Sequence, residues 1–485
     1  MRSTEEKEIL TPTDVEVQPR LQRNALNLFQ ILSSNLAVLA PAEGIFLSIG
    51  LAVAFLGSRA PWAFAIAAVA ILTIGNTLSE FSRVRPSTGS FISLLGTSLQ
   101  SYSPRLAVFV STTCIMLLQL AYPVGLAATV VFLGSWVNSF VPALNWMLVS
   151  VAAVVLITPL VLRGVVVPTI WCFIFFSIEA AGLVVLSIVV LFMTGGHSNV
   201  PFTNLGGMPG FSGLLLAFPI IISGYIGWET AVPLAEESKN PRRHIPITIY
   251  ASILIMGVIY LLSSFAAVVG FAALGGKDPM GNLAGDAAPF LTLAQHYIPW
   301  FAVVVAIMGV TSCLGLYLAA INSNARITFS SAREGILPSV LARLTRGPKP
   351  VPYVSLFLYA GLVLALIIIP GIWLKAIDVF AYEATLGAVP VVLVYLLSNL
   401  ALPLYFWKKR RDEFNWFRHV AIPVIGIGVL ALPIYGFFAP NQPAPYNYFG
   451  WIFAGFVVVS VAWAAYVMIA RPRAAKTLGS IIADE

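Results

Sequence analysis

Four glutamates lie within apolar stretches that are long enough to cross a membrane: Glu43, Glu179, Glu229 and Glu383. No lysine or arginine is expected inside these stretches. An ionised side chain at the centre of a membrane helix costs roughly 2.5–3.5 kcal/mol even on a lenient scale, so the acids are expected to face a polar cavity, to be protonated, or both. Acids without a fixed cation are neutralised by protons or by a cation from outside, which predicts chemistry suited to amines.

Glu43 stands beside two helix-breaking residues, in the run Leu39-Ala40-Pro41-Ala42-Glu43-Gly44. Proline removes a backbone donor and glycine loosens a helix, so the run predicts a break. A break exposes backbone N–H and C=O groups, which line the solute sites of transporters built on broken helices. Contact between Glu43 and a substrate amine is one interpretation, and a hydrogen-bonded residue at a simple kink is the other.

Glu229 follows a second run of this kind, Ser223-Gly224-Tyr225-Ile226-Gly227-Trp228. Its two glycines predict another break, although small residues also form helix–helix packing faces. The rings of Tyr225 and Trp228 can hold an ammonium group by cation–π attraction. The two predicted breaks fall in the first and sixth spans, which are corresponding positions if the chain consists of two inverted five-helix repeats.

The remaining acids have other expected roles. Glu179 lies about 13 residues, or about 20 Å, into the fifth span, which makes it a candidate proton site or a protonated acid bonded to a neighbouring helix. Glu383 begins the tenth span near the outside and is a candidate gate residue. Glu80 ends the second span and is expected to pair with Arg83 at i,i+3, as a structural or gating contact.

The elements that must position these acids are membrane helices. Of 485 residues, 59% are hydrophobic and only 10% are charged, and the mean hydropathy is +0.91. Ordinary soluble domains carry roughly 25% charged residues. The fold class predicted is therefore an all-α polytopic membrane protein with about twelve transmembrane helices. The first span is expected to act as its own insertion signal, since the polar residues 1–26 lack an apolar core.

Lysines and arginines support this topology. If the N-terminus is cytoplasmic, the inside segments collect all 27 of these residues except Arg59, Lys277 and Lys375. This asymmetry predicts a plasma-membrane (inner-membrane) protein with both termini cytoplasmic, and it argues against a nucleic-acid partner despite the net charge of +7. The expected segments are a tail (1–26), two five-helix repeats (27–193 and 212–407), two further helices (418–470) and a second tail (471–485).

Three segments resemble one transporter family. They are Glu80-Phe81-Ser82-Arg83 with Pro86-Ser87-Thr88-Gly89-Ser90, then Gly227-Trp228-Glu229 with the run from Ala235 to Pro246, and Arg326 with Ala332-Arg333-Glu334-Gly335-Ile336-Leu337-Pro338. In these the chain is similar to the amino acid–polyamine–organocation transporters. The resemblance implies the LeuT-like fold of five plus five inverted helices, here followed by two C-terminal helices.

The resemblance also implies which residues hold the substrate. The candidates are the residues of the two predicted breaks: Ala40, Pro41, Ala42, Glu43 and Gly44, with Ser223, Gly224, Tyr225, Ile226, Gly227 and Trp228. Glu229 would take part in proton coupling or gating. Glu179 matches a position where some relatives carry a lysine in place of a sodium ion, and an acid there leaves the coupling ion open.

The chain departs from the family pattern at a second position, and this difference concerns the substrate. Many amino-acid carriers of the family grip the α-carboxylate with a small glycine-rich run in helix one, whereas this chain has Pro41-Ala42-Glu43-Gly44 there. An anionic side chain repels a carboxylate, which favours amines or polyamines over simple amino acids.

We expect a secondary transporter for small amine-bearing solutes, working by alternating access in the lipid bilayer as a monomer or homodimer. Its coupling ion is expected to be H⁺, with Na⁺ as the alternative, and no other cofactor or metal is expected. The alternatives are a neutral amino-acid permease or exchanger and, more remotely, a membrane sensor that does not transport. An enzyme is not expected, because no metal or nucleophile constellation is present.

Overall fold

The computed structural model describes residues 21, 23–164, 166–195, 211–286, 288–438 and 444–470. Within these ranges the chain is helical and has no β-strand. The longer helices are α1 (Leu28–Leu39), α2 (Pro41–Leu56), α3 (Ala60–Val84), α5 (Pro104–Phe140), α6 (Trp146–Val161), α7 (Val166–Thr194), α9 (Phe211–Ser223), α10 (Pro241–Leu274), α13 (Ala302–Arg333), α14 (Tyr353–Gly371), α15 (Ala376–Lys409), α16 (Ile422–Phe437) and α17 (Phe449–Ala470).

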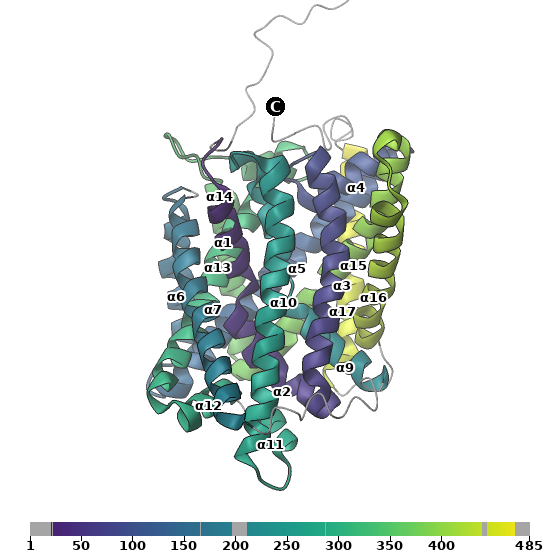
Figure 1. Ribbon diagram of the computed structural model, residues 1–485. Coiled ribbons are helices and arrows are strands. Elements are labelled where there is room, and N and C mark those ends of the chain that lie inside the picture. The colour runs from purple at the N-terminus through teal and green to yellow at the C-terminus, as the bar shows by residue number, and fades with distance from the viewer. Residues whose placement is uncertain are drawn as a thin grey trace, which may run out of the picture.

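Shorter elements connect these helices. They are the α-helices α4 (Ser90–Gln100), α11 (Pro279–Gly285) and α12 (Pro289–Tyr297), the π-helix η8 (Phe417–Ala421), and the 3-10 helices η2 (Gly57–Arg59), η4 (Trp228–Glu237), η5 (Pro299–Phe301), η6 (Ser339–Ala342), η7 (Arg411–Glu413) and η9 (Tyr446–Tyr448). Most long helices run along one common axis, with α11 and α12 at one end of the bundle and α4 at the other (Figure 1).

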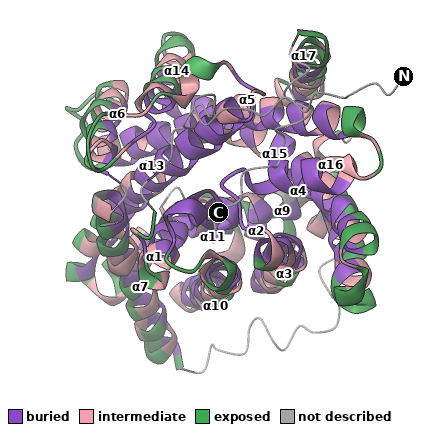
Figure 2. Cartoon of the chain, turned by 90° about the horizontal axis from the view of Figure 1, so that it is seen from above, coloured by how far each residue is buried: buried purple, intermediate pink, exposed green. Residues whose placement is uncertain are grey.

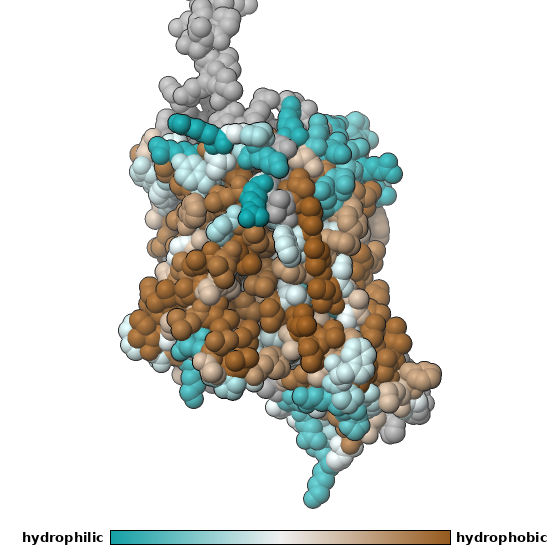
Figure 3. Space-filling model, turned by 90° about the vertical axis from the view of Figure 1, so that its left-hand side faces the viewer, coloured by the Kyte–Doolittle hydropathy of each residue, from teal (hydrophilic) through white to brown (hydrophobic). Residues whose placement is uncertain are grey.

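The surface has the pattern of a protein that sits in lipid. Apolar side chains form a broad belt around the middle of the molecule, and polar side chains gather at its two ends (Figure 3). Large apolar residues stand almost fully exposed, as in Phe192 at 86% and Ile469 at 83%. From above, buried residues concentrate on the helix faces turned toward the middle of the bundle (Figure 2). The chain is therefore an all-α polytopic membrane protein, as predicted.

Nine helices among the described residues are long and apolar enough to cross a membrane. One of them is the run Leu28–Val84, which contains α1, α2 and α3, and Trp146–Val161 is a shorter apolar helix. The predicted total of twelve requires that Leu28–Val84 crosses twice and that α6 and the α9–η4 pair also cross. That total stays a prediction, as does the division into two repeats.

Helix α1 begins with a capping box, because the Asn27 side chain accepts from the amide of Gln30 and the Gln30 side chain accepts from the amide of Asn27. It ends at Ala40, whose φ of 42° and ψ of 70° are left-handed. Proline suits the first position of a helix, so Pro41 starts α2 directly after this reversal. The predicted break in the first span is therefore present.

The predicted break in the sixth span is present as well. Helix α9 stops at Ser223, residues 224–227 form turns, and the chain resumes as η4 after Gly227, whose φ is 114°. A Cβ at Gly227 would lie 2.5 Å from a methyl carbon of Val38, so both the φ and the close approach require glycine.

The halves α1 and η4 are tied to each other. The Leu26 amide donates to the Glu237 carbonyl at 2.8 Å, and the Lys239 amide donates back to the Leu26 carbonyl at 2.9 Å. Deeper in the bundle, the Thr230 hydroxyl donates to the Asn35 side chain at 3.1 Å. These hydrogen bonds connect η4 to α1 and to the segment directly before α1.

Arg326 was expected among the basic residues of the cytoplasmic side, and its burial was not predicted from the sequence. It lies in α13 and is fully buried. Its guanidinium donates to both carboxylate oxygens of Glu237, so the charge is paired within the protein.

A candidate solute site at the helix breaks

The N-terminus of α2 is held by side chains from two other helices. The Ala42 amide donates to Glu179 Oε2 on α7 at 3.4 Å, and the Glu43 amide donates to the Ser312 hydroxyl on α13 at 3.0 Å. A helix start presents unpaired N–H groups and a partial positive charge, so it attracts a carboxylate. This attraction places Glu179 directly beside the first break.

Glu43 and Glu179 are both buried, at 6% and 0% exposed, and each has one oxygen with a partner and one without. The Thr129 hydroxyl on α5 donates to Glu43 Oε1 at 3.0 Å. Glu43 Oε2 and Glu179 Oε1 have no hydrogen-bond partner within the part of the chain that the structure describes. Among the described residues neither acid has an ion pair, so each can accept a proton or a donor from a ligand.

Glu383 lies at the same depth as Thr129. The rings of Phe132 and Phe380 are 5.7 Å apart, and a Cβ at Gly387 would lie 2.8 Å from the backbone nitrogen of Gly125. These two contacts show that α5 and α15 run antiparallel in a register that sets Glu383 opposite Thr129. Glu383 is 6% exposed, and neither of its carboxylate oxygens has a partner.

Glu229 differs from the other three acids because its carboxylate is satisfied. Oε2 accepts from the Gly227 amide at 3.0 Å, and Oε1 accepts from the Tyr122 hydroxyl at 3.3 Å. The neighbouring Trp228 ring packs 5.5 Å from Tyr395 and 6.0 Å from Phe91. Glu229 thus stabilises the turn of the second break and links η4 to α5.

Tyr260 of α10 connects the two breaks. Its hydroxyl lies 3.2 Å from the Leu39 carbonyl, at the end of α1, and 2.8 Å from the Gly224 carbonyl, directly after α9. A Cβ at Gly44 would stand 2.0 Å from the same hydroxyl oxygen. Tyr225 packs edge-on against the Tyr260 ring at 5.0 Å and donates to the Phe64 carbonyl at 3.2 Å. Tyr225 is therefore engaged in packing as well as lying at the break.

Several ion pairs lie at one end of the bundle, which we call the basic end. It is the end at which α3 and α13 terminate, with Arg83 and Arg333 in their last turns. Arg326 pairs with Glu237, and Arg333 pairs with Glu236. The Thr88 hydroxyl lies 3.1 Å from both Glu236 and Ser330. These contacts join η4 to α13 and close this end. Sequence reasoning missed the pairs, and its only signal was that both partners stand in segments with family resemblance.

The predicted ion pair between Glu80 and Arg83 is present, at 3.2 Å. Glu80 also lies 3.6 Å from Arg418 and 3.5 Å from His419, which were not predicted. Their gating role stays a prediction.

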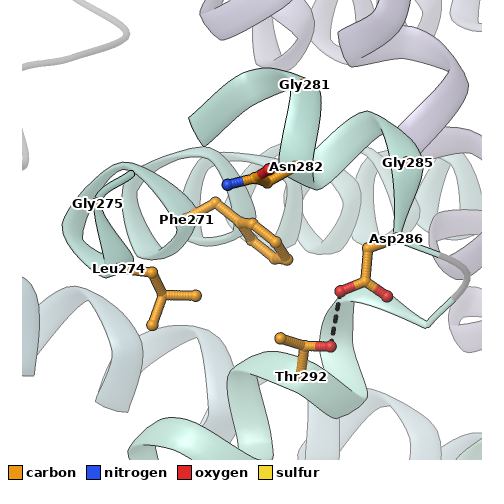
Figure 4. Close-up of a pocket in the computed structure, with 8 residues that line it drawn as sticks. All are labelled: Phe271, Leu274, Gly275, Gly281, Asn282, Gly285, Asp286 and Thr292. Atoms are coloured by element: carbon orange, nitrogen blue, oxygen red, sulfur yellow. Dashed lines mark hydrogen bonds between the residues drawn. The ribbon is translucent and has the colours of Figure 1, made fainter. Parts of the chain in front are cut away.

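A surface hollow of about 490 Å³ lies at the opposite end, between the end of α10 and α11 (Figure 4). There the Thr292 hydroxyl donates to Asp286 at 2.6 Å, and Asn282 lines the rim. None of the predicted site residues lines this hollow. Among the described residues, no group of three or more His, Cys, Asp or Glu side chains could hold a metal ion.

The first break thus collects the amide nitrogens of α2, Glu43 and Glu179, with Glu383 at the same depth. A family model described as amino acid permease matches residues 26–465. The chain belongs to the amino acid permease family. Family membership agrees with the multi-helix architecture and with the resemblance found in the three sequence segments.

Individual members of the family are more distant. The branched-chain amino acid permease BcaP of Bacillus subtilis is 25% identical over 239 residues, which cover 48% of this chain and 46% of that protein. The putrescine transporter PotE of Escherichia coli is 28% identical over 200 residues, covering 40% and 42%. A methylthioribose transporter of Bacillus subtilis is 28% identical over 167 residues, covering 33% and 34%. The alignments span less than half the length of these curated relatives.

Proposed function

We propose that this permease is a secondary active transporter of small amine-bearing solutes (amines, polyamines or amino acids) that works by alternating access. We place it in the plasma membrane with both termini cytoplasmic. One observation carries the proposal: two buried acids beside a broken membrane helix, Glu43 and Glu179, each keep one oxygen without a hydrogen-bond partner and have no ion pair among the described residues.

A cation resolves the electrostatics of these acids. Burying an ionised carboxylate is costly unless it is paired and hydrogen-bonded. An ammonium group brings one positive charge and three N–H donors, and Glu43 and Glu179 each offer a free oxygen. When no ligand is bound, a proton neutralises an acid in the same place. Exchange of a proton for the ligand's cation is the coupling we propose, with H⁺ as the driving ion.

In alternating access, the solute site opens to one end of the bundle at a time. Buried ion pairs of Arg326 and Arg333 with the end of η4 close the basic end. Because α1 and η4 are joined at Leu26, they move together when those pairs separate. That motion opens the first break toward the basic end while the solute site keeps its lining. Glu229 then acts as a gating residue, since its carboxylate joins η4 to α5.

The names of the relatives point to different solutes. The putrescine transporter and the cationic amino acid transporters of Arabidopsis thaliana support a cationic substrate. The branched-chain amino acid permease supports the alternative of a neutral amino-acid permease or exchanger. If the substrate is neutral, only protons can neutralise the buried acids.

Transport by the full chain in proteoliposomes tests the proposal. We expect a labelled amine or amino acid from a panel of putrescine, ethanolamine, arginine and leucine to accumulate when the lumen is made acidic, because each ligand cation that enters is exchanged for a proton that leaves. Accumulation should persist without sodium and should fall at least tenfold in Glu43→Gln, whereas the exposed-site control Glu413→Gln should transport normally. Uptake of none of the panel, or uptake that Glu43→Gln leaves unchanged, would contradict the proposal.

A further inference from the structure

The donors at the first break are already taken. In a helix that starts at Pro41, the amides without an intrahelical partner are those of Ala42 and Glu43, because Pro41 has no N–H and Gly44 donates to the Ala40 carbonyl at 2.9 Å. Ala42 donates to Glu179 and Glu43 donates to Ser312. The start of α2 therefore offers no free N–H group to an anion from outside.

Charge points the same way. A helix start normally binds carboxylates and phosphates because its N–H groups and its dipole are uncompensated. Here the compensating anion is internal, as Glu179 fills that place. The oxygens without a partner at this break belong to Glu43 and Glu179, and both are acceptors when ionised. A ligand carboxylate would meet the negative charge of the ionised acids and find no free backbone N–H group at this break.

The space beside Gly44 at the first break is restricted as well. Tyr260 places its hydroxyl so close to Gly44 that even a methyl group would not fit there. That hydroxyl is in turn engaged by the Leu39 and Gly224 carbonyls. It is therefore not available as a donor for a carboxylate unless both contacts are given up.

From these contacts we infer that the solute is an amine without a carboxylate, and that Glu179 with Ser312 excludes amino acids by occupying the amides of α2. This inference rests on the proposed function and narrows it, because amines and amino acids are both included there. Glu179 is a specificity-determining residue that acts through the backbone of α2.

Pairs of solutes that differ by one carboxylate test this inference separately from the proposed transport function. Putrescine and ornithine differ only by a carboxylate, as do cadaverine and lysine, ethanolamine and serine, and 3-methylbutylamine and leucine. Binding to the purified full chain is measured by competition with the best labelled solute and by thermal shift. We expect the amine of at least one pair to bind more than tenfold more tightly than its amino acid. An amino acid that binds as well as its amine overturns this inference and leaves the proposed transporter standing, whereas no binding by any of the eight contradicts both.

Variants then test the role of Glu179. Glu179→Ala frees the Ala42 amide and Ser312→Ala frees the Glu43 amide, so each should raise the affinity for the amino acid of the favoured pair relative to its amine. Ser177→Ala, on the same helix as Glu179, removes only a hydrogen bond to the Phe173 carbonyl and should leave the ratio unchanged. A folded Glu179→Ala or Ser312→Ala protein with the wild-type ratio would overturn the inference. If Glu179→Ala does not fold, Ser312→Ala decides alone.

Discussion

Gly44→Ala should damage this permease far more than its single added methyl group suggests. A Cβ at Gly44 would lie 2.0 Å from the Tyr260 hydroxyl oxygen and 2.9 Å from the ring carbon that carries it. Ordinary contact begins at 3.4 Å, so the hydroxyl must retreat by at least about 1.4 Å (3.4 − 2.0). A retreat of that size breaks its 2.8 Å contact with the Gly224 carbonyl or its 3.2 Å contact with the Leu39 carbonyl.

The cost follows from two contributions. Overpacking a close-packed interior costs about 1–3 kcal/mol. Losing a buried hydrogen bond and leaving a carbonyl unpaired adds about 1–3 kcal/mol. We therefore expect Gly44→Ala to lower stability by about 2–6 kcal/mol and to weaken solute binding, since Tyr260 holds the two breaks at their present separation.

Gly50→Ala is the matched control on the same helix. Its Cβ would lie 3.4 Å and 3.5 Å from the carbonyl oxygens of Ala284 and Leu283, at the edge of ordinary contact. Thermal unfolding in detergent and binding of the preferred solute are measured for both variants, and Gly44→Ala is also combined with Tyr260→Phe. Removing the hydroxyl should restore part of the lost stability. If Gly44→Ala melts and binds as Gly50→Ala does, the reasoning from this contact is refuted.

Three further predictions concern the acids and their partners. Replacing either Glu237 or Arg326 alone with an apolar residue should cost about 3–5 kcal/mol in a thermal-unfolding double-mutant cycle, and replacing both should recover most of it; additive losses would contradict their pairing. Glu229→Ala should lower the free energy of unfolding by about 2–4 kcal/mol, because the Gly227 amide and the Tyr122 hydroxyl lose their hydrogen-bond partner. The free energy of unfolding of Glu383→Gln should lie within about 1 kcal/mol of the wild-type value, because the carboxylate oxygens of Glu383 have no partner among the described residues. Thr129→Val should reduce solute affinity about tenfold by releasing Glu43, while Thr129→Ser keeps the hydroxyl and should bind normally; equal binding by the two would show that this hydrogen bond is unimportant.

The helix breaks were predictable because their causes are local. Pro41 follows the reversal at Ala40, and Gly227 carries the positive φ that resumes the chain as η4. The presence of buried acids was predictable too, since apolar runs of sufficient length show where lipid must be. The proximity of Glu80 and Arg83 followed from helical spacing alone.

What each acid touches was not predictable. Glu179 meets the Ala42 amide only because α7 packs against the first break, and Glu383 lies at the depth of Thr129 only through the register of α5 and α15. Glu229 shows the reverse case, since tertiary contacts satisfy an acid that sequence grouped with the others. The contacts Ala42–Glu179 and Tyr122–Glu229 join residues 137 and 107 positions apart, and spacing along the chain carries no information on such pairs.

The backbone link between Leu26 and the end of η4 has a practical consequence for handling the protein. Two hydrogen bonds connect the entrance of the first membrane helix to the half-helix that follows the second break. Force applied to the chain just upstream of residue 26, by an affinity resin, a fused reporter or an optical trap, is therefore transmitted to both halves of the solute site at once. A flexible linker at that end would keep such a load off both segments.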